Sequence, residues 1–312
     1  MPSSTHFTPK GWALFALLAL VWGMPYLFIA EAVETFSPAA VVGIRTFGAA
    51  LLLLPFALKQ GALKPALKHW PWVLAFGAVE MAGPFVLLAH AEQTLASGLT
   101  GLFVATVPLF ATAIAVARGD RGALRPSRAV GLALGFAGVA VVALGSGALD
   151  GEISLLAIGE VLLVAVCYAI APFIVARHLP DVPSLGVITL SMAAVGIVYL
   201  PIGIVTTTEP PTTRSLAGMA LLTVLCTAVA FIAFFALIAE VGPVKAPLMT
   251  YLHPVVAIVL GMLVRGEPLT LGLIVGFPIV LAGCLLAAGV FTRGQKPSAV
   301  APAVEVPAAA VR

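Results

Sequence analysis

Charged side chains are rare in this sequence, and the few that interrupt its long apolar stretches are the best candidates for chemistry. Glu80 stands midway along the stretch 70–89, and Glu160 lies in the stretch 154–175. A charge at the bilayer centre costs about 2.5–3.5 kcal/mol on insertion scales, so such residues usually face a cavity or a partner. We therefore predict that both carboxylates line a cavity, where Glu80 binds an ammonium group or carries a proton. The alternative is a buried carboxyl, protonated or paired, that locks helices together.

Aromatic residues and one histidine accompany these carboxylates. Four of the aromatic side chains offer π-faces for an organic cation and a polar tip for hydrogen bonding, namely Trp22, Tyr26, Tyr168 and Tyr251. Aromatic residues in spanning helices more often pack in the core or face lipid, and a cavity role is favoured for Trp22 and Tyr251. His253 has an imidazole, which changes charge near neutral pH, although a packing role between helices is the favoured interpretation.

Other residues in or beside these stretches are predicted to be structural. Arg45 is expected to pair with another side chain rather than to contact a substrate. Pro108 and Pro254 free backbone carbonyls in mid-membrane and are expected to bend the helices that contain them. Glu267 precedes the last apolar stretch and is expected to cap the helix that begins there, because anions favour helix N-termini.

The elements that must position these residues are transmembrane helices. Hydrophobic residues make up 61% of the 312 positions and charged residues 9%, whereas about a quarter of a soluble chain is charged. The excess apolar surface must face lipid, where a spanning helix needs about 20 apolar residues. Ten stretches qualify and predict an all-α membrane protein: 11–30, 38–57, 70–89, 97–117, 128–146, 154–175, 184–205, 215–238, 243–264 and 269–291.

The positive charges predict how these helices are threaded. With a cytoplasmic N-terminus at 1–10, Arg214 and Arg265 fall outside, and Arg45 and Lys245 fall within stretches. The remaining cations fall inside: Lys10, Lys59, Lys64, Lys68, Arg118, Arg121, Arg125, Arg128, Arg177, Arg293, Lys296 and Arg312. This bias supports ten helices in the cell membrane with both termini cytoplasmic, and the stretch 292–312 is expected to be a disordered cytoplasmic tail.

An internal repeat divides the chain at its middle. A shift of 145–146 positions superposes Pro38 on Pro183, Pro108 on Pro254, Trp22 on Tyr168, Gly131 on Gly276 and Gly138 on Gly283. The shift relates five helices at 11–146 to five at 154–291. Because five is odd, the second unit must enter the membrane in the opposite orientation. Inverted repeats of this kind recur in secondary transporters, with the binding site between the halves near the midplane.

The chain resembles the drug/metabolite transporter superfamily, specifically its EamA-type members. The resemblance rests on Trp22-Gly23, Arg45, the stretch Ala91 to Pro108, Gly242-Pro243, Thr250-Tyr251-Leu252, Pro254, Gly261, Gly266-Glu267 and Gly283. It departs from the family at Gly119-Asp120, where a longer basic loop through Arg128 predicts a local insertion. The resemblance implies ten helices around a central cavity lined by helices 1, 3, 4, 6, 8 and 9. It also implies export of amino acids or related small metabolites by alternating access.

Other functions fit the sequence less well. An enzyme would need clustered catalytic groups or metal ligands, whereas the histidines are scattered at His6, His69, His90, His178 and His253. We expect no enzymatic activity, cofactor, metal site or nucleic-acid partner. The expected partners are the lipid bilayer and a small-molecule substrate, with proton coupling and a homodimer left open. A multidrug exporter and a non-transporting membrane scaffold or receptor are the alternative functions.

Overall fold

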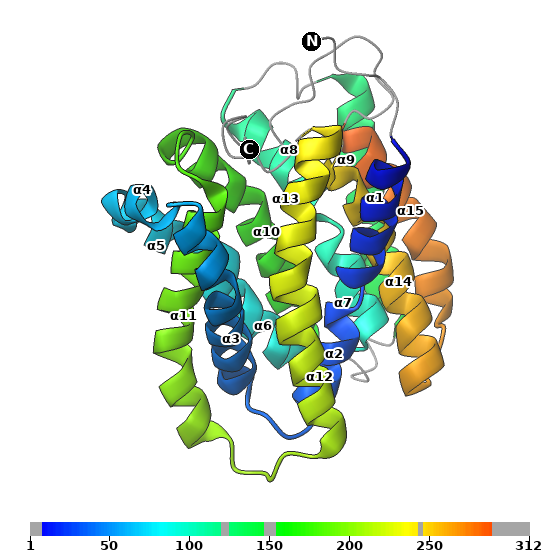
Figure 1. The fold of residues 1–312 in the computed structure, drawn as a ribbon. Coiled ribbons are helices and arrows are strands. Elements are labelled where there is room, and N and C mark those ends of the chain that lie inside the picture. The colour runs from blue at the N-terminus through cyan, green and yellow to red at the C-terminus, as the bar shows by residue number, and fades with distance from the viewer. Residues whose placement is uncertain (1–7, 120–124, 147–153, 243–245, 289–312) are drawn as a thin grey trace.

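The computed structural model describes residues 8–119, 125–146, 154–242 and 246–288, which form helices and no strand (Figure 1). The α-helices are α1 (Pro9–Val21), α2 (Pro25–Ala32), α3 (Pro38–Lys59), α4 (Leu63–Lys68), α5 (Trp70–Gly77), α6 (Gly83–Ala91), α7 (Ser97–Val104), α8 (Val107–Ala117), α9 (Pro126–Gly145), α10 (Leu155–His178), α11 (Ser184–Thr206), α12 (Thr213–Thr223), α13 (Ala230–Val241), α14 (His253–Leu260) and α15 (Leu271–Ala287).

Within the described residues, nine continuous helical segments are long and apolar enough to cross a membrane. We number them spans 1 to 9: Pro9–Ala32, Pro38–Lys59, Trp70–Ala91, Ser97–Ala117, Pro126–Gly145, Leu155–His178, Ser184–Thr206, Thr213–Val241 and Ala246–Arg265. Helix α15, at the tenth predicted stretch, is apolar but has 17 residues. The all-α membrane class is confirmed. Residues 1–7 of the predicted N-terminus, part of the basic loop, Lys245 and the tail 292–312 lie outside the described residues.

Local sequence signals explain where many of these helices begin. The hydroxyl oxygens of Thr8, Ser37 and Thr270 accept backbone N–H groups at the starts of α1, α3 and α15. Hydroxyl side chains at this position satisfy N–H groups that have no partner within the helix. Pro9 and Pro38 follow two of these caps in the first helical turn, where proline needs no N–H donor.

The two prolines predicted to bend their helices stand at interruptions of the α-helix in spans 4 and 9. Helix α7 ends at Val104, and α8 starts at Val107 with Pro108 in its first turn. In span 9, a 3-10 turn at Ala246–Leu252 gives way to α14, with Pro254 in its first turn. The missing N–H of each proline breaks the helical ladder at the same place in both halves.

Spans 3 and 8 each contain a π-helical turn at equivalent positions. We call Ala78–Ala82 the first π-turn and Val224–Val229 the second. A shift of 146 residues, the same as that between Pro108 and Pro254, superposes the start of one on the start of the other. Such turns insert one residue into a helix and are frequent at functional sites.

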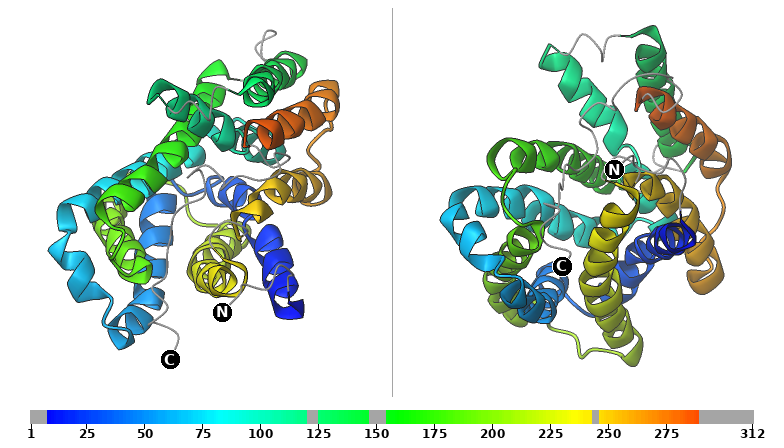
Figure 2. Two further views of the ribbon diagram at one scale, coloured as in Figure 1. Left: turned by 90° about the horizontal axis from the view of Figure 1, so that it is seen from above. Right: turned by 45° about the horizontal axis from the view of Figure 1, so that its top comes forward.

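Spans from the two halves pair closely. Helix α3 packs on α11, and α9 packs on α15, and Figure 2 shows these pairs at opposite edges of the molecule. Both pairs are antiparallel. Gly145 meets Gly272 at one end of α9 while Gly131 meets Ala287 at the other, and along α3 Ala40 meets Gly203 while the later Phe47 meets the earlier Gly196. A Cβ on Gly283 would lie 2.4 Å from the Cα of Gly135, so only glycine permits this approach. The glycines of α9 and α15 therefore allow these two helices of one chain to pack closely.

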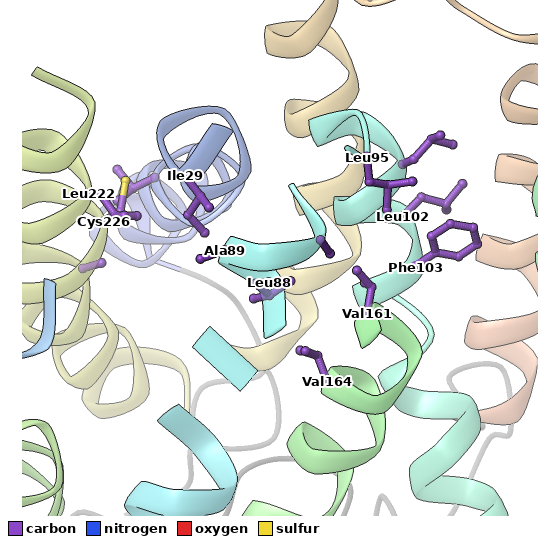
Figure 3. Packing of buried hydrophobic residues seen from close by; sticks show 14 of the residues in the cluster. Ile29, Leu88, Ala89, Leu95, Leu102, Phe103, Val161, Val164, Leu222 and Cys226 are labelled. Carbon is purple, nitrogen blue, oxygen red and sulfur yellow. The ribbon is translucent and has the colours of Figure 1, made fainter. Parts of the chain in front are cut away.

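The remaining pairs interleave the halves. Span 1 packs on span 8 through α2 with α12 and α1 with α13, and span 6 packs on span 3 through α10 with α6. A continuous apolar core joins them. Figure 3 shows Ile29 of α2, Leu88 of α6, Phe103 of α7 and Val164 of α10 converging on this core.

Candidate functional site

Arg45 occupies the middle of the bundle, on α3. Its side chain is almost fully buried, with 7% exposed. The Nε atom donates to Thr227 Oγ1 at 2.9 Å, and the guanidinium carbon lies 3.9 Å from the centroid of the Phe85 ring. No carboxylate forms an ion pair with Arg45 among the described residues. Arg45 is thus held by a hydroxyl and an aromatic face rather than by direct contact with a carboxylate of the described residues.

The second π-turn explains why Thr227 can hold Arg45. Thr227 Oγ1 donates to the carbonyl of Leu222 at 2.7 Å while it accepts from Arg45. The carbonyl of Cys226, in the same turn, accepts from Trp22 Nε1 at 3.1 Å. The extra residue of the turn breaks the regular ladder, and side chains from other helices supply the bonds.

Glu80 lies in the first π-turn, where it was expected to line a cavity. Its side chain is partly exposed, and it has no hydrogen bond or ion pair among the described residues. It interacts electrostatically with Cys167 and Tyr168 of α10. A carboxyl with accessible surface and no protein partner is free to bind a cation or a proton.

Two tyrosines interact electrostatically with Arg45, and one of them also interacts with Glu80. Tyr168 interacts electrostatically with both Glu80 and Arg45, and Tyr26 of α2 interacts with both Tyr168 and Arg45. Neither hydroxyl has a hydrogen-bond partner among the described residues. We call Tyr26, Arg45, Glu80 and Tyr168 the inner polar cluster. It brings together residues of spans 1, 2, 3 and 6 from both halves.

Trp22 and His253 belong to a group of aromatic rings next to the π-turn that holds Arg45. The Trp22 ring lies 5.5 Å from Phe231 and 4.9 Å from Phe234, between centroids, and 6.2 Å from His253. The Nε2 atom of His253 is buried and has no hydrogen-bond partner in the part of the chain that the structure describes. Tyr251, in the 3-10 turn of span 9, is partly exposed.

Glu160 belongs to a separate contact. Its carboxylate lies 2.9 Å from His90 Nδ1, and the His90 side chain is 52% exposed. Sequence analysis grouped Glu160 with Glu80, but only Glu80 joins the inner polar cluster.

Glu267 does not cap the helix that follows it, so this prediction is wrong. Thr270 caps α15. The Glu267 carboxylate instead accepts from Ser97 N at 2.9 Å, Ser97 Oγ at 2.7 Å and Gly98 N at 3.1 Å, at the start of α7. Ala96, the residue before α7, has no side-chain acceptor, so the anion that this N-terminus favours comes from the other half.

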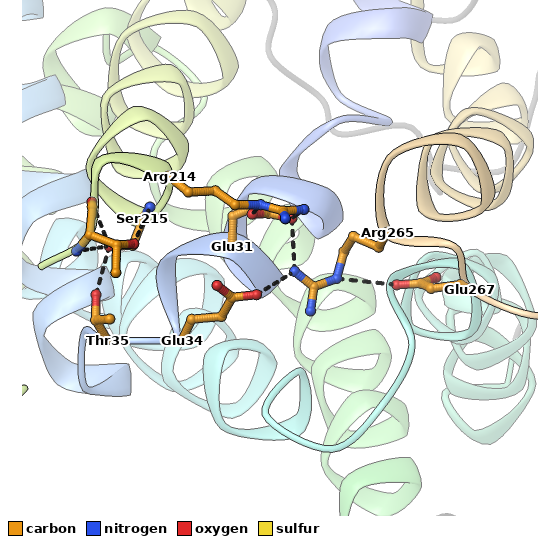
Figure 4. A network of polar contacts seen from close by, with 8 residues as sticks. Glu31, Glu34, Thr35, Arg214, Ser215, Arg265 and Glu267 are labelled. Carbon is orange, nitrogen blue, oxygen red and sulfur yellow. Dashed lines mark hydrogen bonds and ion pairs between the residues drawn. The ribbon is translucent and has the colours of Figure 1, made fainter.

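A polar network that sequence analysis did not predict surrounds Glu267 (Figure 4). Glu31 is bound by Arg214, with Nη2 at 2.7 Å, and by Arg265, with Nη1 at 2.8 Å. Arg265 Nη1 also lies 3.0 Å from Glu34, and its Nε lies 3.8 Å from Glu267. We call these five residues the outer network, because Arg214 and Arg265 are the cations predicted to lie outside.

A hydroxyl pair extends the outer network between spans 1 and 8. Thr35 Oγ1 and Ser215 Oγ lie 2.6 Å apart. Beside Glu267 there is a hollow of about 200 Å³ that is mostly apolar and contains no residue of the inner polar cluster. No three potential ligands gather into a metal site among the described residues.

The pattern of the EamA-like transporter family matches residues 9–144 and again residues 155–289. The chain belongs to the EamA-like transporter family. The double match covers both groups of spans described above, and multi-pass membrane transporters of this family are the proteins that the chain resembles along nearly its whole length.

Individual family members agree with this assignment. The inner membrane transporter YedA of Escherichia coli K12 is 32% identical over 86% of this chain and 89% of its own length. The transporter YvbV of Bacillus subtilis is 25% identical over 92% of this chain and 94% of its own. A solved crystal structure superposes with a TM-score of 0.62 at 18% identity, over 90% of this chain and 96% of that one, which shows the fold alone.

Proposed function

We propose that this transporter family member moves small zwitterionic metabolites, such as amino acids, out of the cell by alternating access. The proposed architecture has ten transmembrane helices, with α15 as the tenth, in two inverted five-helix repeats at 11–146 and 154–291. The antiparallel packing of α3 on α11 and of α9 on α15 supports it, since equivalent helices of inverted repeats run in opposite directions. The bias of positive charges supports cytoplasmic termini.

The cargo class follows from one observation. Arg45 and Glu80 share the inner polar cluster, and neither has an ion pair among the described residues. A zwitterion would supply both missing partners, its carboxylate to Arg45 and its ammonium to Glu80. Buried charges gain most from hydrogen-bonded partners, so this cargo binds better than a neutral molecule of equal size.

The arrangement of the two halves supports the proposed alternating access. The outer network joins spans 1, 8 and 9 beyond the inner polar cluster, which closes this end of the molecule. In a second state, the outer network would open and the equivalent interface at the other end of the molecule would close, so that the inner polar cluster faces outward. Proton coupling through Glu80 is part of the proposal.

The test is flux in proteoliposomes with a panel of radiolabelled amino acids. Arg45→Gln and Glu80→Gln should each lower flux about 10- to 100-fold at unchanged protein level. Glu160→Gln is the matched control, because it removes a carboxylate paired with His90 outside the cluster. Equal flux in all three variants, or no flux of any amino acid by the wild type, would refute the proposed cargo class.

A multidrug exporter is the second candidate, favoured by the aromatic group of Trp22, Phe231 and Phe234. An organic cation would need these rings and Glu80 but not Arg45. Flux of a lipophilic cation that survives Arg45→Gln would select this function. A non-transporting scaffold predicts no flux of either class.

A further inference from the structure

Glu92 is a buried carboxyl that the proposed cargo site does not use. It follows span 3 directly and is 5% exposed. Among the described residues, neither carboxyl oxygen has a hydrogen-bond partner of normal geometry, although the backbone of Ala30 is close enough to act on the carboxyl. A buried polar group without a partner is costly, and an ionised one far more so. Burial of Glu92 therefore favours the neutral, protonated carboxyl over the carboxylate.

The surroundings of Glu92 connect the two polar groups of the molecule. Arg45 and Tyr26 of the inner polar cluster interact electrostatically with it, and so do Arg265 and Glu267 of the outer network. Helix α10, which also packs on α6, carries Glu160, whose carboxylate is bound by His90. Burial, and then the charge of Glu267, raise the pKa of Glu92, while Arg265, the backbone of Ala30 and Arg45 oppose the shift.

Glu92 and Glu267 stand at opposite kinds of helix end. Glu267 receives three hydrogen bonds at the N-terminus of α7, where an anion is favoured by the helix dipole. Glu92 is the C-cap of α6, at the negative end of the helix dipole, where a carboxylate is disfavoured. Arg265, the cation that could compensate, is bound to Glu31 and Glu34 instead.

We propose that Glu92 is the proton-binding site that couples the outer network to the inner polar cluster. When the network is closed, Arg265 is occupied and Glu92 holds a proton. When the network opens, water or the released Arg265 reaches Glu92, which then ionises. The inference rests on the proposed alternating access and assigns the proton to Glu92 in addition to any proton on Glu80.

The sign of the pH effect follows from linkage. The closed state has the higher pKa and binds more proton, so lowering the pH favours closure and raising it favours opening. Each unit of pKa difference between the two states changes the closed-to-open ratio about tenfold across the titration range. Glu92→Gln mimics the protonated form and should keep the network closed at every pH.

Cross-linking tests this without a cargo. In Thr35→Cys/Ser215→Cys, the new sulfurs replace oxygens 2.6 Å apart, so diamide should link spans 1 and 8 only when the network is closed. The three native cysteines are replaced by serine, and the protein is studied in proteoliposomes. Thiol ionisation affects Glu92 and Glu92→Gln proteins equally, so the ratio of their cross-linking isolates the carboxyl.

We expect this ratio to be near one at acidic pH and to fall about tenfold per unit of pKa difference as the pH rises. Glu92→Asp, which can still titrate, should restore pH dependence and shows that the fold tolerates the site. A ratio constant with pH, or one that rises, would overturn the proposal. Because no cargo is present, absence of amino-acid flux would refute the proposed function and leave this result intact.

Discussion

The interface between spans 1 and 8 and the interface between spans 6 and 3 are equivalent at an offset of 146 residues, yet they are filled differently. At the centre of the first, Trp22 donates to the carbonyl of Cys226. At the equivalent positions of the second stand Tyr168 and Glu80, which interact electrostatically but have no hydrogen bonds among the described residues. The backbone of these two interfaces repeats, including the first and second π-turns, whereas the side-chain chemistry does not.

The ends of these interfaces differ in the same way. Gly218 packs tightly against Glu31 of the outer network. The residue equivalent to Gly218 is Trp72, which stacks on His178 with centroids 3.4 Å apart. One end is therefore closed by ion pairs and close packing, and the other by one aromatic contact. We infer that the repeat provides two similar arrangements, and that unequal side chains decide which interface binds cargo and which closes.

Making the two π-turns chemically alike should have the largest effect. Glu80→Cys places the second half's residue in the first π-turn and removes the charge that holds the cargo ammonium. A hydrogen bond to a charged group contributes about 1.5–3 kcal/mol, so amino-acid transport should fall about 10- to 100-fold. Cys226→Ser is the control and should transport normally, because its carbonyl makes the contact with Trp22. Equal losses in both variants would contradict the asymmetry.

The second-largest effect is expected for Trp22, compared with Tyr168 at the equivalent position of the other half. Trp22→Phe leaves the Cys226 carbonyl in the second π-turn without its donor and should cost about 1–3 kcal/mol of unfolding free energy. Tyr168→Phe removes a hydroxyl that has no hydrogen bond among the described residues and should cost less. Reversible unfolding in mixed micelles measures both, and a larger loss for Tyr168→Phe would show that the second interface is the rigid one.

Removing the cap that crosses between the halves should have a smaller effect. Glu267→Ala leaves the N–H groups of Ser97 and Gly98 without acceptors and should cost about 0.5–2 kcal/mol, as for other N-caps. Hydrogen exchange should accelerate at Ser97 and Gly98, whereas Thr270→Ala should accelerate it at Leu273. Acceleration at Leu273 in Glu267→Ala would restore the prediction made from sequence.

The smallest effect is expected at the end of the second interface, where Trp72 stacks on His178. Trp72→Ala removes the stack on His178, and aromatic pairs contribute about 0.5–1.5 kcal/mol beyond their buried area. Modification of Cys167 by a small thiol reagent should become about 2- to 10-fold faster, with Cys226 and Cys284 replaced by serine. An unchanged rate would show that the stack does not limit access to the cluster.

Sequence patterns predicted the helices and their bends because those features have local causes. The length of each apolar stretch locates a span. Pro108 and Pro254 interrupt their helices because proline lacks an N–H, whatever the tertiary contacts. The contacts of Glu267 with α7 and of Arg214 with Glu31 have no local signal, since their partners are more than 150 residues away. Ala96 gave a hint, because it is a poor cap for α7. The π-turns depend on donors such as Trp22 from other helices, so local propensity does not reveal them.

The claim that Arg45 and Glu80 together recognise a zwitterion is tested most directly by cargo analogues. For a transported amino acid, binding to purified protein is compared with its methyl ester, which lacks the carboxylate, and its N-acetyl derivative, which lacks the ammonium. Wild-type protein should prefer the amino acid to both analogues. Arg45→Gln should lose discrimination against the ester alone, and Glu80→Gln against the N-acetyl form alone. Undiminished discrimination in both variants would contradict the account.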